Sequence, residues 1–166
     1  MATLIAIPLL GLLLLIQSAI VSQIPLLHGT ADLPLLAIIA WALQKRVQTA
    51  WHWSIIGGLM YNLTSALPFG VPLVAYGLVT GLALVLRKRV WQVPVLAMFF
   101  TTFVGTLIVH GISLFALRVL GDPIPIIQAL DLVTLPSLLL NLVLAVPAYA
   151  MISDLANWFY PEEIEV

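Results

Sequence analysis

Long runs of apolar residues, separated by short polar or charged clusters, make up almost the whole chain. Apolar runs of about 20 residues predict helices that span a bilayer. Six runs reach or approach this length, and they cover residues 3–27, 33–43, 50–67, 71–86, 91–119 and 136–159. The pattern predicts an all-α integral membrane protein, a bundle of six transmembrane helices. We expect one domain over residues 1–160 and a short acidic cytoplasmic tail at 161–166.

The positive charges support this order and orient it. Lys45 and Arg46 separate the second and third runs, and residues 87–89 (Arg-Lys-Arg) separate the fourth and fifth. These positions hold five of the six Lys and Arg residues, and Arg118 is the sixth. Short Lys- and Arg-rich connections stay in the cytoplasm. We therefore expect both connections and both termini on the cytoplasmic side.

A stretch of unusual polarity, "YNLTSALPFGVPLVAYG", lies at residues 61–77. If the connections on either side are cytoplasmic, the third and fourth runs must cross out and back, which requires an external turn near residues 67–72. Pro68 and Pro72 interrupt a continuous helix, and Gly70 permits a tight backbone. The stretch therefore predicts a turn between two helices.

The second run is the weak point of this topology. Residues 31–43 would extend only about 20 Å as a helix, against a hydrocarbon core of roughly 30 Å. Snorkelling of Lys45 and Arg46 and local thinning of the bilayer would cover the difference. A re-entrant second run would instead leave five crossings and an external N-terminus, so both topologies stay open.

Small and polar residues recur at helical spacing along the third, fourth and fifth runs. The positions are Ser54, Gly58, Tyr61 and Ser65, then Gly77 and Gly81, then Thr102, Thr106, His110 and Ser113. Such stripes let helices approach closely and bond to one another. The alternative is that they enclose a polar cavity for a small solute. We favour helix packing.

The composition narrows the possible functions. Hydrophobic residues form 63% of the chain and charged residues 8%, with a net charge of −1 and no cysteine. A basic face for nucleic acid is missing, and so are a carboxylate pair, a nucleophile motif and a metal-ligand cluster. We expect no enzyme activity, metal or cofactor. Asp32 is expected to cap the second helix, and the five Trp residues to form a belt at the inner interface.

Three stretches resemble the bacterial rod shape-determining protein MreD family. They are "ADLPLLAIIAWAL", "GGLMYNLTSALPFGVPLVAYGLVTGLAL" and "LPSLLLNLVLAVPAY". The matched positions are Gly58, Leu63, Thr64, Ser65, Pro68, Phe69, Gly70 and Tyr76, followed by Pro136, Asn141 and Pro147. One departure is that the acidic residue usual in the Gly-rich helix of the family appears here as Asn62.

The resemblance implies a non-catalytic subunit of the machinery that elongates the side wall of bacteria. It implies a multi-pass protein of the bacterial inner membrane. Its partners in that family are MreC, RodA, a class B penicillin-binding protein and, indirectly, the filament protein MreB. The family resembles, in its six-helix fold, the S components of energy-coupling factor transporters. A solute-binding S component is therefore the alternative function.

The turn stretch is the predicted partner site. A turn requires Pro and Gly, but it does not also require several polar residues. We expect the following residues to help hold the membrane-proximal segment of MreC: Asn62, Thr64, Ser65, Pro68, Phe69 and Gly70. The alternative is that the polar members only satisfy the end of the third helix.

Overall fold

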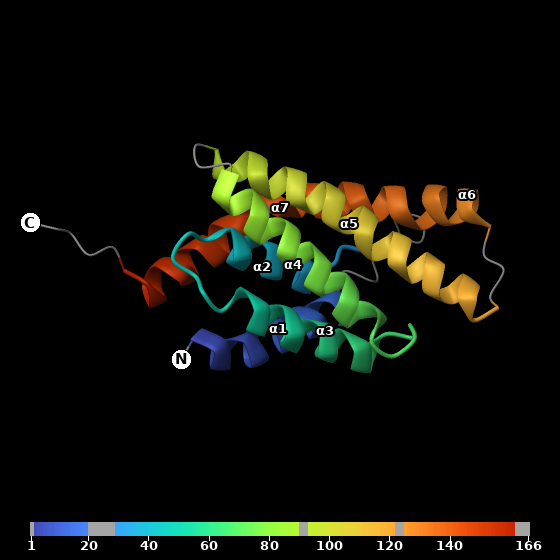
Figure 1. Ribbon diagram of the computed structural model, residues 1–166, viewed down its shortest axis with the longest axis horizontal. Coiled ribbons are helices and arrows are strands. Elements are labelled where there is room, and N and C mark those ends of the chain that lie inside the picture. Colours follow the sequence, from blue (N-terminus) through green and yellow to red (C-terminus); the bar gives the residue numbers. More distant parts are fainter. Residues whose placement is uncertain (1, 20–28, 90–92, 122–124, 162–166) are drawn as a thin grey trace, which may run out of the picture.

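The computed structural model describes residues 2–19, 29–89, 93–121 and 125–161, and its described residues form a bundle of helices that run back and forth along one axis (Figure 1). The elements are α1 (Ala2–Ala19), α2 (Leu33–Leu43), α3 (Ala50–Thr64), α4 (Val71–Arg89), α5 (Pro94–Val119), α6 (Ile126–Ala129), the π-helical turn η2 (Leu130–Thr134) and α7 (Leu135–Phe159). Because α6, η2 and α7 are continuous, the described residues form six helical segments, the number that the sequence predicts.

The described part of the chain has the character of a membrane protein. Three of its helical stretches are long and apolar enough to cross a bilayer, namely Val71–Lys88, Pro94–Val119 and Ile126–Phe159. Large apolar side chains point outward from several helices, among them Leu15, Phe115, Val143 and Met151. In water such a surface would be costly, whereas lipid is a favourable environment for it.

The short helix α2 lies in the middle of the bundle, where α1, α3, α4, α5 and α7 all contact it. Every residue from Pro34 to Leu43 is buried. A helix that is apolar on all sides is a core helix. Its 11 residues extend about 16 Å, much less than a bilayer core. Since other helices surround α2, it does not need the length of a lipid-facing span.

The basic connections meet at one end of the molecule, which we call the basic end. The segment Gln44–Val47, Arg87, Pro94 and Tyr160 line one small pocket there. The opposite end, which we call the turn end, carries the turn between α3 and α4. Figure 1 shows α1 starting and α7 finishing at the basic end. This arrangement is the one that six alternating segments require.

The turn itself is confirmed. Helix α3 ends at Thr64 and α4 begins at Val71. Gly70 has a φ of 90°, in the left-handed region that favours glycine. The amide of Val71 donates to the carbonyl of Pro68 at 3.1 Å, which closes the turn.

Two other expectations need correction. Residues 126–134 lie outside the apolar run at 136–159 that predicts the last helix, yet they are helical, and a wide π turn precedes α7. Pro136 has no amide hydrogen, so a regular helical bond to Leu132 cannot form, which fits the wide turn there. Trp41 and Trp53 are fully buried and stacked, with ring centroids 4.2 Å apart. These two rings belong to the core and not to an interfacial belt.

Candidate functional site

A buried hydrogen-bond network at the start of α2 joins parts of the chain that are far apart in sequence. The amide of Asp32 donates to Asn141 Oδ1 on α7 at 2.8 Å, and Asn141 Nδ2 donates to Thr106 Oγ1 on α5 at 3.0 Å. The amide of Thr30 donates to Ser137 Oγ at 3.0 Å, and that of Leu33 to Gln17 Oε1 on α1 at 2.9 Å. Side chains of α1 and α7 thus satisfy the backbone that leads into α2, and Thr106 on α5 holds one of them, Asn141, in place.

These hydrogen bonds to the backbone allow α2 to begin inside the bundle. Irregular backbone at membrane depth is tolerated only where protein or water supplies its hydrogen-bond partners. Gly29 lies so close to α7 that an added Cβ would approach Ser137 N within 2.6 Å. The predicted helix cap is confirmed as well, because Asp32 Oδ1 accepts from the amide of Leu35 at 3.0 Å.

The Asp32 carboxylate also binds α4. The Tyr76 hydroxyl donates to Oδ1 at 2.7 Å and lies 2.9 Å from Oδ2. Asp32 is 8% exposed and Tyr76 is fully buried. The Tyr61 ring of α3 lies against the Tyr76 ring, with centroids 5.7 Å apart. An acidic group is therefore held among helices by tyrosine and by the start of α2.

A cavity of about 500 Å³ opens beside this carboxylate at the turn end. Helices α3, α4 and α5 and the α6–η2–α7 segment contribute its walls. Apolar residues such as Leu67, Val109 and Leu132 form much of its wall. Its polar side chains include those of Asp32, Tyr61, Tyr76, His110, Ser113 and Gln128. The size is within the range of small-molecule sites, about 300–1,000 Å³.

The polar stripe of α5 divides between packing and this cavity. Thr102 and Thr106 are buried between helices. His110 and Ser113, one and two turns further on, line the cavity instead. His110 Nδ1 lies 3.2 Å from Thr134 Oγ1, whose own hydroxyl donates to the carbonyl of Ala129. One half of the α5 stripe therefore packs between helices, and the other half lines a cavity.

The stripe on α3 packs against its neighbours. A Cβ on Gly58 would come within 2.8 Å of Leu73 Cα on α4, so this glycine allows close approach. Ser54 is buried and its hydroxyl makes no bond with any residue that the structure describes. Ser65 lies beyond the end of α3, so it does not continue the stripe.

The glycines of α4 differ from the sequence-based expectation. A Cβ on Gly77 would have no atom within 4 Å, and one on Gly81 would make an ordinary 3.6 Å contact with Trp51. Gly77 therefore does not bring helices of this bundle together. With Val74, Leu78, Gly81 and Val85 it forms an outward strip, which we call the α4 face, because these positions share one side of a helix. Its Val and Leu members are exposed.

The polar residues of the turn bond within the turn. Asn62 Oδ1 accepts from the amide of Gly70 at 3.0 Å, and Ser65 Oγ accepts from the amide of Leu67 at 3.0 Å. Thr64 Oγ1 donates to the carbonyl of Tyr61 at 3.1 Å. Asn62 therefore has a local role in this turn. Phe69 gives the turn an apolar surface, because its side chain is 80% exposed. The neighbouring Pro68 is half-buried.

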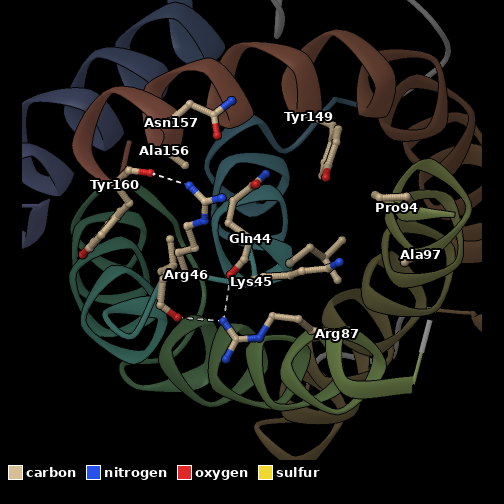
Figure 2. Close-up of a pocket in the computed structure, with 12 residues that line it drawn as sticks. Gln44, Lys45, Arg46, Arg87, Pro94, Ala97, Tyr149, Ala156, Asn157 and Tyr160 are labelled. Atoms are coloured by element: carbon tan, nitrogen blue, oxygen red, sulfur yellow. Dashed lines mark hydrogen bonds between the residues drawn. The ribbon is translucent and has the colours of Figure 1, made fainter. Parts of the chain in front are cut away.

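A second, smaller pocket of about 170 Å³ lies at the basic end (Figure 2). Arg87 NH1 donates to the carbonyls of Gln44 at 2.8 Å and Val47 at 2.7 Å, and Arg46 NH1 donates to the carbonyl of Tyr160 at 3.1 Å. Figure 2 shows Arg87 reaching the backbone of the segment after α2. It also shows Arg46, which belongs to that segment, reaching Tyr160 after the end of α7. Arg87 thus satisfies carbonyls beyond the C-terminal end of α2, as Asn141 and Gln17 satisfy amides at its start.

Sequence reasoning missed most of this network. Asp32 was assigned only a capping role, and Asn141 was named only as one of the positions that carry the resemblance. Its side chain instead binds α2 and α5. Gln17 and Ser137 carried no expectation. The usable signal was the short apolar helix itself, whose ends needed polar partners from other segments.

Comparisons with protein-family models, with curated proteins and with solved structures found no match for this chain.

Proposed function

We propose that this chain is a non-catalytic membrane scaffold of the MreD type, which binds MreC in the complex that elongates the bacterial cell wall. The supporting observation is the network around α2. Asp32, Tyr76 and Asn141 come from the three stretches that carry the resemblance, and they bond to one another. The network gives these motif residues a common physical purpose, which is to hold a short central helix.

The proposal includes a topology. Six helical segments alternate in direction, with the basic end in the cytoplasm and the turn end outside. The positive-inside rule supports this orientation because the pocket at the basic end contains Lys45, Arg46 and Arg87. The membrane would be the bacterial inner membrane, and RodA, a class B penicillin-binding protein and, indirectly, MreB would be the further partners.

We assign the MreC contact to the α4 face and the adjoining turn. Small residues flanked by exposed apolar ones suit the approach of another transmembrane helix. Gly77 and Gly81 are the small residues, and Val74, Leu78 and Val85 surround them. A bitopic partner offers one such helix, and its next segment would meet Phe69 at the external turn. The turn residues Asn62, Thr64 and Ser65 then shape the site instead of touching the partner.

The test compares two glycines. Neither Gly77 on α4 nor Gly111 on α5 has an atom within 4 Å of an added Cβ, so both positions have open space where a side chain would begin. We expect Gly77→Leu to reduce recovery of co-expressed MreC several-fold from detergent extracts, whereas Gly111→Leu leaves recovery unchanged. Both variants should keep the thermal stability of the isolated protein. Equal recovery of MreC with both variants would refute the assignment of the α4 face.

A second candidate is a solute-binding S component, and the cavity of about 500 Å³ at the turn end favours it. An S component is expected to display an Ala-rich coupling face on its early helices. Ala6 on α1, a residue that could contribute to such a face, is buried in the bundle. Location of the gene beside cell-shape genes or beside vitamin-uptake genes distinguishes the two candidates.

A further inference from the structure

The part of the cavity wall that the structure describes offers the Asp32 carboxylate no Lys or Arg as a counter-ion. Lys45, Arg46 and Arg87 line the pocket at the basic end, and Arg118 is exposed on the last turn of α5. A buried charge without a partner is costly, and an ionisable residue at membrane depth indicates a functional site.

Protein groups satisfy this carboxylate only in part. An ionised carboxylate has about four acceptor positions. Among the described residues, Oδ1 accepts from the amide of Leu35 and the Tyr76 hydroxyl, whereas Oδ2 has the longer contact with that same hydroxyl and no other. Burial away from water opposes the charge on this carboxylate most strongly, whereas these donors and the start of α2 favour it. Oδ2 therefore keeps capacity for a further donor.

The remainder of the cavity is suited to an organic cation. The rings of Tyr61 and Tyr76 lie beside Asp32 and line the cavity, and the faces of aromatic rings attract ammonium groups. Leu114, Leu117 and Val133 are among the apolar residues further along the wall. His110 is the one described side chain of the wall that has a basic nitrogen, and its Nδ1 is paired with Thr134.

We propose that the cavity at the turn end binds a small organic ammonium compound, with the ammonium group on Asp32 Oδ2 and an apolar body along α5 and η2. Such a ligand supplies the missing positive charge and the hydrogen-bond donor together. The cavity is lined by none of the residues of the α4 face, and Leu67 is its contact with the adjoining turn, whereas Phe69 lies outside it. Ligand binding and MreC binding can therefore succeed or fail separately.

The experiment measures the thermal stability of the purified full chain in a neutral detergent. Octylammonium and 1-octanol serve as probes, because they share an alkyl chain and differ in charge. A saturable rise in the melting temperature with octylammonium, and a smaller, unsaturable effect of octanol, is expected. Equal responses to the two probes, or no response to octylammonium, would overturn the proposal.

Asp32→Asn supplies the decisive variant. Asparagine also caps helices and still accepts a hydrogen bond from Tyr76, but it has no charge. We expect its affinity for octylammonium to fall about tenfold or more, a loss of at least one charge-assisted bond. An unchanged affinity in Asp32→Asn contradicts the proposal.

A second variant tests the cavity without changing the carboxylate. Ser113 Oγ donates to the carbonyl of Val109 within α5, so Ser113→Leu breaks no bond between helices and fills space in the cavity. It should abolish the octylammonium response, whereas Gly111→Leu on the same helix should preserve it. A normal response in Ser113→Leu would show that the probe binds elsewhere.

The ammonium group has two possible sources, a free amine or the ethanolamine head of a phospholipid. Mass spectrometry of lipids that co-purify with wild type and with Asp32→Asn distinguishes them. Enrichment of phosphatidylethanolamine over phosphatidylglycerol in wild type alone indicates a lipid. Equal lipid ratios together with the octylammonium response indicate a free amine.

Discussion

Replacing Asn141 should destabilise the bundle more than any exposed change on the same helix. The side chain is 1% exposed and links α7 to α2 through the amide of Asp32 and to α5 through Thr106 Oγ1. Asn141→Leu keeps the branching at Cγ but removes both bonds. It also leaves the amide of Asp32 buried without this acceptor.

The expected loss follows from these contacts. Two hydrogen bonds contribute about 1 kcal/mol each, and a stranded buried amide costs roughly 1–3 kcal/mol. Hydrogen bonds between membrane helices average nearer 0.6 kcal/mol, which lowers the sum. We therefore expect Asn141→Leu to reduce the free energy of unfolding by roughly 2–4 kcal/mol.

Reversible unfolding in mixed micelles with increasing dodecyl sulfate measures this loss, with tryptophan fluorescence as the signal from the buried Trp41–Trp53 stack. Val143→Leu is the control, since Val143 is 73% exposed on the same helix. Its effect should stay within about 0.5 kcal/mol. The double variant with Thr106→Val should show coupling of about 1 kcal/mol, in keeping with one shared bond. A loss below 0.5 kcal/mol for Asn141→Leu would refute the network around α2 as a source of stability.

Three further changes test other contacts. Gly58→Ala should lower the melting temperature because its Cβ would meet the backbone of Leu73. Gly111→Ala, with open space around it, should raise the free energy of unfolding by up to about 1 kcal/mol. Similar melting temperatures for both would argue against the close α3–α4 contact. Arg87→Gln should cost about 1.5–3 kcal/mol and expose the connection after α2 to protease, since it removes the donor to Gln44 and Val47; an unchanged cleavage rate would be inconsistent with that role. Asn62→Ala with Ser65→Ala should speed proteolysis at the turn of the isolated protein, because both side chains accept from turn amides; loss of MreC recovery with an unchanged turn would instead restore these residues as direct partner contacts.

The sequence pattern was sufficient to predict features that depend on one type of residue at neighbouring positions. The order of apolar runs predicted the helices, and Pro68 with Gly70 predicted the turn. The alternation of basic connections predicted that Lys45 and Arg87 would meet at one end. In each case the information is local or depends on a simple count of crossings.

The parts that sequence could not predict depend on which residues meet across the bundle. Asp32 and Asn141 are separated by 109 positions, and nothing local to either one names the other. Gly77 and Gly58 belong to similar small-residue patterns, yet only Gly58 faces another helix of the chain. Residues 126–134 resemble part of a loop because Gly121, Pro123 and Pro125 come just before them, but the helix that continues as α7 extends through them.

The most direct test of the central claim is photo-crosslinking in living cells of the protein's host. A photoreactive amino acid replaces Leu78 on the α4 face, and the control replaces Val143 on α7, which is also exposed. We predict a crosslinked product with MreC from position 78 and much less of it from position 143. Absence of MreC from the products at position 78, with both variants expressed at equal levels, would contradict the account.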